Sequence, residues 1–214
     1  MLKLKFVNKG YNMKKILVDY VIRNKKNFII ILVVFCIGIV IGSISINNLA
    51  ENQKVELNKY IEDLVQNIKN SQNIDRLNLL ILSIKQNVII ILLVWFLGCT
   101  IIGGVFIYIA IFYKGFSIGY TVSALISVLG IRHGAFVAIF SIFIQNLIFI
   151  PAFFLIAENG IKLYKGIYKK CINLKEEVIR QSIIMFISIM LSIISSFVEV
   201  YFSINILIFL KEII

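Results

Sequence analysis

Glu199 is the first candidate for chemistry in this sequence, because it is an acid inside a long apolar run. If that run crosses a bilayer, a charge near its centre costs at least about 2.5–3.5 kcal/mol. We therefore expect Glu199 to lie near an interface, to be protonated or to be paired. Arg132 is its candidate partner, and Tyr201 stands two residues further along the run. We expect a structural contact, with docking of another protein as the alternative.

Gln145 and Asn146 are polar residues in another apolar run, and Pro151 follows them. Pro151 cannot donate a hydrogen bond to the carbonyl of Leu147, so we expect its helix to kink there. Polar groups in lipid need partners, and interhelical hydrogen bonds are worth roughly 0.6–2 kcal/mol each. We therefore expect Gln145 and Asn146 to clamp two spans together, and a binding site is the alternative.

No arrangement of catalytic residues is found in the sequence. There is no H-E-x-x-H, no G-x-S-x-G and no P-loop, and the three Asp residues lie in polar segments. His133, the one histidine, has nothing near it that completes a site, so we expect it in a turn. Cys36, Cys99 and Cys171 lack metal or redox spacing. We expect no enzyme activity, no metal and no cofactor.

The composition is that of an integral membrane protein. The 214 residues are 60% hydrophobic and 15% charged, with a mean hydropathy of +0.95. Soluble domains have about 45–50% apolar and about 25% charged residues. The net charge of +11 comes from bases that flank apolar spans, which indicates membrane topology and argues against nucleic-acid binding.

The apolar and basic segments predict an all-α, polytopic membrane helix bundle of about five transmembrane helices. The segments are a basic amphipathic leader at 1–27, a first span at 28–46, an extracytoplasmic helical segment at 47–87, a central array of three helices at 88–157, a basic cytoplasmic loop at 158–181, and a last span with its tail at 182–214. Within the array, Lys114 and Arg132 are expected at two tight connections. A cytoplasmic N-terminus places fifteen of the 22 Lys and Arg residues in the cytoplasm, as the positive-inside rule requires.

Three glycine pairs are spaced by four, Gly38/Gly42, Gly115/Gly119 and Gly130/Gly134, and such pairs allow helix backbones to approach closely. We expect close packing between helices of one chain, and dimerisation through Gly38 and Gly42 is the alternative.

The segment 47–87 contains one apolar helix edge, formed by Leu57, Ile61, Leu64 and Ile68. About forty residues are too few for an independent core. We expect a helical hairpin packed on itself; the alternatives are packing on the membrane surface, on a second copy or on a partner.

The runs FYKGFSIGYTVSAL at 112–125 and FIQNLIFIPAFFLIA at 143–157 resemble the signature region of the stage II sporulation protein M family. The order of features also resembles that family, from the basic leader and the glycine-bearing first span to Glu199-Val200-Tyr201 in the last span. The resemblance covers nearly the whole chain. The chain departs from the family pattern after Tyr201, where it has no proline, and relatives outside spore formers vary around Gln145-Asn146.

The resemblance implies a polytopic protein of the sporangial septal or engulfing membrane, needed for engulfment. It implies a non-catalytic scaffold that recruits two peptidoglycan-degrading partners, stage II sporulation proteins P and D. Contacts are expected through residues 47–87 and the outer turns, with membrane lipids and further copies of the chain as other neighbours. A membrane subunit of a transporter or permease is the alternative, since Pro151 and Gly103-Gly104 could break helices near the midplane.

Overall fold

The computed structural model describes residues 24–70, 76–100, 102–169 and 174–210, and the side chains of 62, 64–70, 141, 169 and 203–210 are also outside the description. Every regular element in these ranges is helical, which confirms the all-α prediction. The elements are α2 (Lys25–Asn47), α3 (Glu51–Asn70), α4 (Arg76–Gly98), α5 (Gly103–Val137), the π-helix η1 (Ala138–Phe143), α6 (Ile144–Lys169) and α7 (Leu174–Leu210). The predicted leader at 1–27 lies almost entirely outside the described residues.

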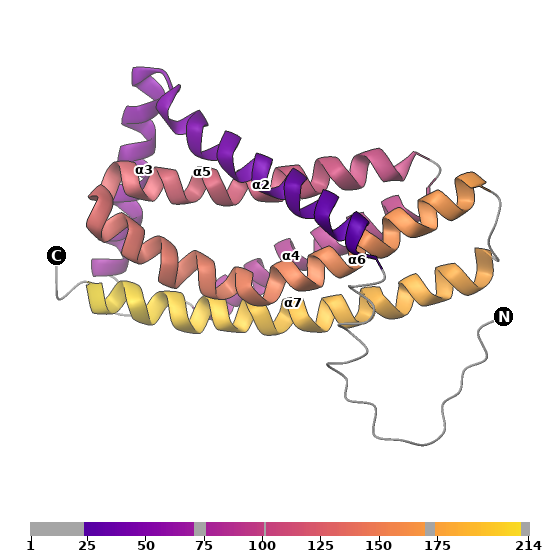
Figure 1. The fold of residues 1–214 in the computed structure, drawn as a ribbon. Helices are drawn as coiled ribbons and strands as arrows, with labels where there is room; N and C mark the ends of the chain where they lie inside the picture. Colours follow the sequence, from indigo (N-terminus) through magenta and orange to yellow (C-terminus); the bar gives the residue numbers. More distant parts are fainter. Residues whose placement is uncertain (1–23, 71–75, 101, 170–173, 211–214) are drawn as a thin grey trace.

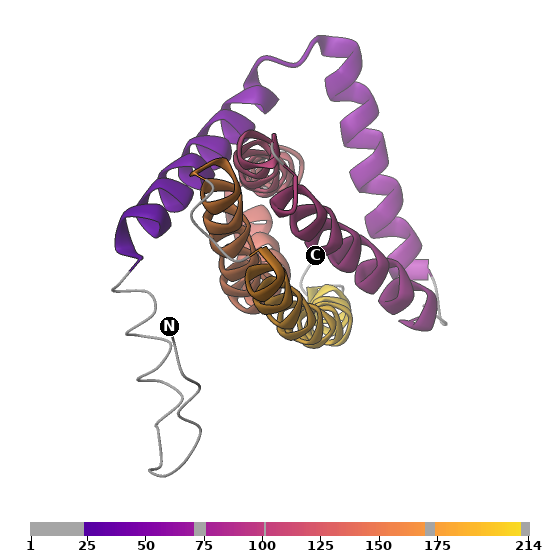
Figure 2. The ribbon, with the colours of Figure 1, turned by 90° about the vertical axis from the view of Figure 1, so that its right-hand side faces the viewer.

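Five of these helices are long and apolar enough to cross a membrane, as the sequence predicted. Figure 1 shows α4, α5, α6 and α7 running along one common direction, with α2 crossing α5 obliquely. Helix α3 lies across the end of the bundle where α2 ends, transverse to the spans. Figure 2 shows α3 along one side of the view, running from the end of α2 toward the start of α4.

The predicted connection at Lys114 is wrong, because Lys114 lies in the middle of α5. The short connection is instead at residues 99–102, where the amides of Cys99 and Thr100 donate to the carbonyls of Phe96 and Leu97 at 3.1 and 3.0 Å. The apolar run continues through this turn, so hydropathy could not mark it. The predicted segment 47–87 also ends too late, since α4 begins at Arg76.

Gly130 interrupts α5 with φ 80° and ψ 164°, values that a helix does not contain. A left-handed φ of this kind is tolerated by glycine and strained for other residues. The chain reverses here, beside Arg132, and then runs through η1 into α6 as the next span (Figure 1). The ribbon bends where η1 meets α6. A π-helix and a proline are both known causes of helix bends, and Pro151 lies inside α6, shortly after η1.

The bundle buries polar side chains beside an apolar core and exposes apolar side chains on its outside, as expected for a protein whose solvent is lipid. Phe149, Phe153 and Ile107 are fully buried in the main core. Serines of α7 (Ser188, Ser192, Ser195 and Ser196) are buried as well, whereas apolar side chains such as Phe186 are exposed.

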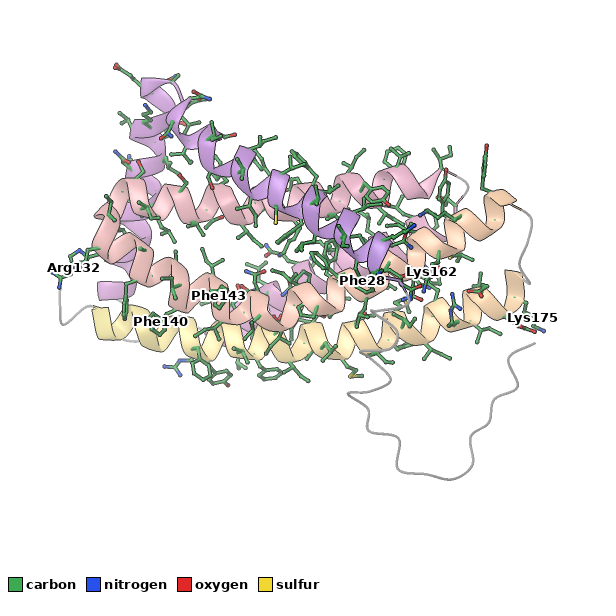
Figure 3. The ribbon with its side chains drawn as sticks, in the orientation of Figure 1. Phe28, Arg132, Phe140, Phe143, Lys162 and Lys175 are labelled. Carbon is green, nitrogen blue, oxygen red and sulfur yellow. The ribbon has the colours of Figure 1, made fainter. Side chains whose placement is uncertain are left out.

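The two ends of the bundle differ in charge and covering. Figure 3 shows Lys162 and Lys175 at the end away from α3, and Arg132 at the end near α3. Lys25 begins α2 at the same end as Lys162. This end carries the bases that the positive-inside rule places in the cytoplasm. The cytoplasmic orientation of the N-terminus stays a prediction.

Candidate functional site

Helices α2 and α5 meet at their two glycine pairs. A Cβ at Gly38 would run into the carbonyl oxygen of Phe112, and one at Gly42 into the backbone of Phe116. Gly115 and Gly119 stand in the same way against the α2 backbone at Phe35 and Ile39. The backbones are therefore in direct contact, the geometry that glycines spaced by four allow.

Two serines add hydrogen bonds to this crossing. The Ser43 hydroxyl donates to the carbonyl of Gly119 at 3.3 Å, and the Ser123 hydroxyl donates to the carbonyl of Ser43 at 3.1 Å. The four glycines thus pack within one chain. The alternative of a dimer through Gly38 and Gly42 is not supported, because α5 occupies that face.

Glu199 of α7 is held by α4 and α6. Its Oε2 accepts a hydrogen bond from the Ser83 hydroxyl and another from Gln145 Nε2, the latter at 2.6 Å. Arg132 is not among these partners and lies exposed at the end of the bundle (Figure 3). The predicted pair is therefore replaced by two uncharged donors. Tyr201 is exposed and stacks on Phe197 with ring centroids 6.3 Å apart.

Gln145 behaves as the predicted clamp, whereas Asn146 does not. Besides the bond to Glu199, the Gln145 carbonyl accepts from the Ser195 hydroxyl of α7 at 2.9 Å. Asn146 Nδ2 instead donates to Ile142 in its own helical segment at 2.7 Å. Asn146 is 6% exposed, and its Oδ1 is buried without a hydrogen-bond partner among the described residues.

Asn87 extends the polar contacts from α4 to α7. Its Nδ2 donates to the Ser196 hydroxyl oxygen at 3.0 Å and to the Ser83 hydroxyl oxygen at 3.5 Å. Ser83 and Asn87 are both buried. Sequence reasoning missed this pair, because both residues fell in the segment assigned to the extracytoplasmic side. Their spacing of four, on an otherwise apolar stretch, was the available signal.

These residues line a cavity of about 630 Å³ between α4, α5, α6 and α7. Its polar lining includes Ser83, Asn87, Lys114, Gln145, Asn146 and Glu199. The lining residues Gln86 of α4 and Tyr113, Ser117 and Thr121 of α5 are exposed. The cavity therefore opens sideways between α4 and α5.

Lys114 faces this cavity and has no ion-pair partner among the residues that the structure describes. Its Nζ lies 4.4 Å from the centroid of the Phe149 ring, a cation–π distance. The ion pairs within 4.0 Å among the described residues are Lys162–Glu158 and Arg180–Glu177. Lys114 and Glu199 thus have opposite formal charges and line the same cavity, but the distance between them exceeds that of a salt bridge.

An apolar pocket of about 290 Å³ adjoins the polar cavity. Ile118, Ile142 and Asn146 line both spaces. Phe35 and Ile39 of α2 and Phe143 of η1 complete its apolar wall, and Figure 3 labels Phe143 midway along the bundle. A polar and an apolar space therefore share one wall.

A second polar cluster lies near the basic end of the bundle. Glu158 is fully buried in α6 and pairs with Lys162 at 2.9 Å. Buried Gln181 of α7 donates to the Trp95 carbonyl of α4 at 3.2 Å. The predicted loop at 158–181 is therefore wrong at its start, because Glu158 lies inside α6. The run ends at Ala157 in sequence, but its helix continues to Lys169.

The apolar edge of α3 packs on the end of α5. Buried Ile61 and half-buried Leu57 lie in a cluster with Ile46 of α2 and Ala124 of α5. The side chains of Leu64 and Ile68 lie outside the described residues. The edge therefore packs on the spans, and the predicted self-packed hairpin is wrong, because the chain after α3 becomes the span α4.

No group of three or more His, Cys, Asp or Glu residues that could hold a metal occurs in the described ranges. Cys36 and Cys99 are free thiols, while Cys171 is outside the described residues. His133 is half-buried near the reversal at Gly130. The site is thus a set of fixed hydrogen-bonding groups around a cavity.

Comparison with known proteins gives one match. The family model described as Stage II sporulation protein M matches residues 31–204, from the first span to the last. No curated protein and no solved structure matches the chain.

Proposed function

The chain belongs to the stage II sporulation protein M family, and from that membership we propose that it is a non-catalytic membrane scaffold of the engulfment machinery. In this role it anchors peptidoglycan-degrading partners at the septal or engulfing membrane. By resemblance to the family, these partners are stage II sporulation proteins P and D.

The observation that carries the proposal is the placement of α3. Leu57 and Ile61 fix one edge of α3 to the bundle end, while Val55 and Tyr60 are 66% and 63% exposed. Around them α3 exposes acidic and basic residues, among them Glu56 and Lys59. An exposed tyrosine within a charged surface is typical of a protein-docking patch.

In the predicted topology this patch is extracytoplasmic, the side on which the proposed partners would act. With the N-terminus in the cytoplasm, α3 and the reversal at Gly130 are extracytoplasmic. A helix held rigidly at the membrane surface brings a bound partner close to the membrane without acting on the wall itself.

The test is recovery of the partners from membranes of sporulating cells with the tagged full chain. Tyr60→Ala should lower recovery of stage II sporulation proteins P and D about tenfold or more, because an aromatic anchor in an interface is worth about 2 kcal/mol. Tyr168→Ala is the matched control, since Tyr168 is 74% exposed at the opposite end. Equal recovery with both variants, or no recovery with the unaltered chain, contradicts the proposal.

A membrane subunit of a transporter or permease is the second candidate, and the polar cavity favours it. Lys114, Glu199 and eight uncharged polar residues line the cavity, a richer lining than the sequence suggested. Recovery of a nucleotide-binding subunit in place of the wall enzymes would support transport over the scaffold.

A further inference from the structure

We propose that the cavity between α4, α5, α6 and α7 binds a zwitterion, with its phosphate at Lys114 and its primary ammonium group at Glu199. This is the headgroup chemistry of phosphatidylethanolamine. The inference rests on the cavity and is independent of the scaffold role of α3.

The first step is the separation of the two charges. Lys114 and Glu199 line one cavity but form no ion pair among those of the described residues. Isolated charges at this depth are costly, and nearby opposite charges in a low dielectric attract strongly. A ligand that carries an anion and a cation at a fixed distance compensates both charges without drawing α5 and α7 together.

The second step is the placement of donors and acceptors. Both hydrogen bonds to Glu199 within the described residues reach Oε2, so Oε1 is left for a ligand. Asn146 Oδ1 is also buried without a partner in the described part of the chain. An ammonium group has three donors and no acceptor, and it therefore matches the acceptors of α6 and α7. The Lys114 ammonium of α5 provides the donors that a phosphate needs.

The third step concerns the source of the zwitterion. The cavity opens between α4 and α5, at the exposed residues Gln86, Ser117 and Thr121. A sideways opening between spans leads into lipid. The adjoining apolar pocket, behind Ile118 and Ile142, suits part of an acyl chain. A volume of about 630 Å³ also lies in the range of roughly 300–1,000 Å³ found for ligand sites. A lipid headgroup is therefore favoured over a free solute.

The experiment measures lipid retention by the purified full chain with native mass spectrometry. Equal mixtures of phosphatidylethanolamine and phosphatidylglycerol are offered in detergent, since the second lipid has the phosphate and lacks the ammonium group. We expect preferential retention of phosphatidylethanolamine. Lys114→Gln and Glu199→Gln should each weaken it about tenfold, the effect of losing one charge-assisted contact.

Lys85→Gln and Glu56→Gln are the matched controls, because both residues are exposed and neither lines the cavity. Ser117→Trp is a second test that leaves the charges in place: the exposed position should accept the ring, which then blocks the opening and lowers retention. Helix content by circular dichroism must match the unaltered chain in every variant.

Free phosphoethanolamine distinguishes the two sources. If it displaces the lipid at millimolar concentration and stabilises the chain by itself, with dependence on Lys114 and Glu199, the natural zwitterion is water-soluble. If it does not, the lipid is the ligand. Equal retention of phosphatidylethanolamine and phosphatidylglycerol overturns the proposal. So does retention of phosphatidylethanolamine that persists in folded protein with both charge substitutions and with Ser117→Trp.

Discussion

On one face of α5, Gly115 and Gly119 touch the backbone of α2, whereas on another face Lys114, Ser117 and Thr121 line a cavity that α4 leaves open. These two faces come from one short stretch, in which Lys114 and Gly115 are neighbours in sequence. The first face, here called the closed face, has no room even for one methyl group on its glycines. The second face, called the open face, borders a cavity large enough for a ligand.

The difference shows how a small membrane protein can be both a rigid anchor and a polar site. Direct backbone contact gives van der Waals packing that lipid cannot replace. With α2 fixed in this way, α5 does not need to close on α4 to remain in place. The cavity can therefore persist among helices that are elsewhere tightly packed.

The largest expected effect comes from breaking the closed face. Gly38→Leu must push α5 away, because even a Cβ at this position meets the carbonyl of Phe112. We expect a loss of at least about 3 kcal/mol in the free energy of unfolding, the upper range for overpacking. Unfolding in sodium dodecyl sulfate, followed by the fluorescence of the one tryptophan, Trp95, measures it.

Val40→Leu is the control for that variant, because Val40 is 56% exposed on the same helix. It should change stability by less than about 0.5 kcal/mol. Similar losses from the two variants would mean that α2 does not pack on α5 through its glycines.

The closed face could be predicted from the sequence, because glycines spaced by four point to close packing whatever the partner is. Which helix supplies the partner could not be predicted, since α2 and α5 are separated by more than fifty residues. The pairing depends on how all the spans pack together, and one span's sequence does not contain that information.

Removing one hydrogen bond at the open face should lower the free energy of unfolding less than overpacking the closed face does. Gln145→Leu removes the hydrogen bond from α6 to Glu199, and we expect about 1–2 kcal/mol of destabilisation. In a double-mutant cycle with Glu199→Gln, the coupling energy should be at least about 0.6 kcal/mol. Additive effects of the two substitutions would show that the clamp does not act.

The smallest effect is expected from Ser43→Ala at the closed face. Ser43 donates to Ile39 in its own helix at 2.9 Å and to Gly119 of α5 at 3.3 Å. Ser45→Ala is the matched control, since Ser45 donates to Ile41 of the same helix alone. The two variants should differ by at most about 0.6 kcal/mol in the free energy of unfolding. A difference above about 2 kcal/mol would mean that hydrogen bonding, and not backbone contact, holds α2 to α5.

The open face was the harder part to predict. A single lysine in an apolar run is consistent with a turn or with a buried site, and the division of residues 88–157 into three spans puts Lys114 at a turn. The true connection, at residues 99–102, adds no charge to the pattern, whereas the reversal at Gly130 lies beside Arg132, where the sequence predicts one. Glu199 and Gln145 were identified as polar residues in apolar runs, but their mutual contact depends on the packing of α6 on α7.

Cysteine labelling at two near-neighbouring positions of α5 tests the contrast between its faces most directly. In a chain with Cys36, Cys99 and Cys171 replaced by Ser, Thr121→Cys lies at the cavity opening and Ser123→Cys at the contact with α2. The positions are two residues apart, so they differ little in depth. A thiol reagent applied to the folded chain in detergent should modify Cys at 121 at least about tenfold faster than Cys at 123, because the side chain at 121 is exposed at the cavity opening and the one at 123 lies against α2. Equal rates at the two positions would contradict the two-faced packing of α5.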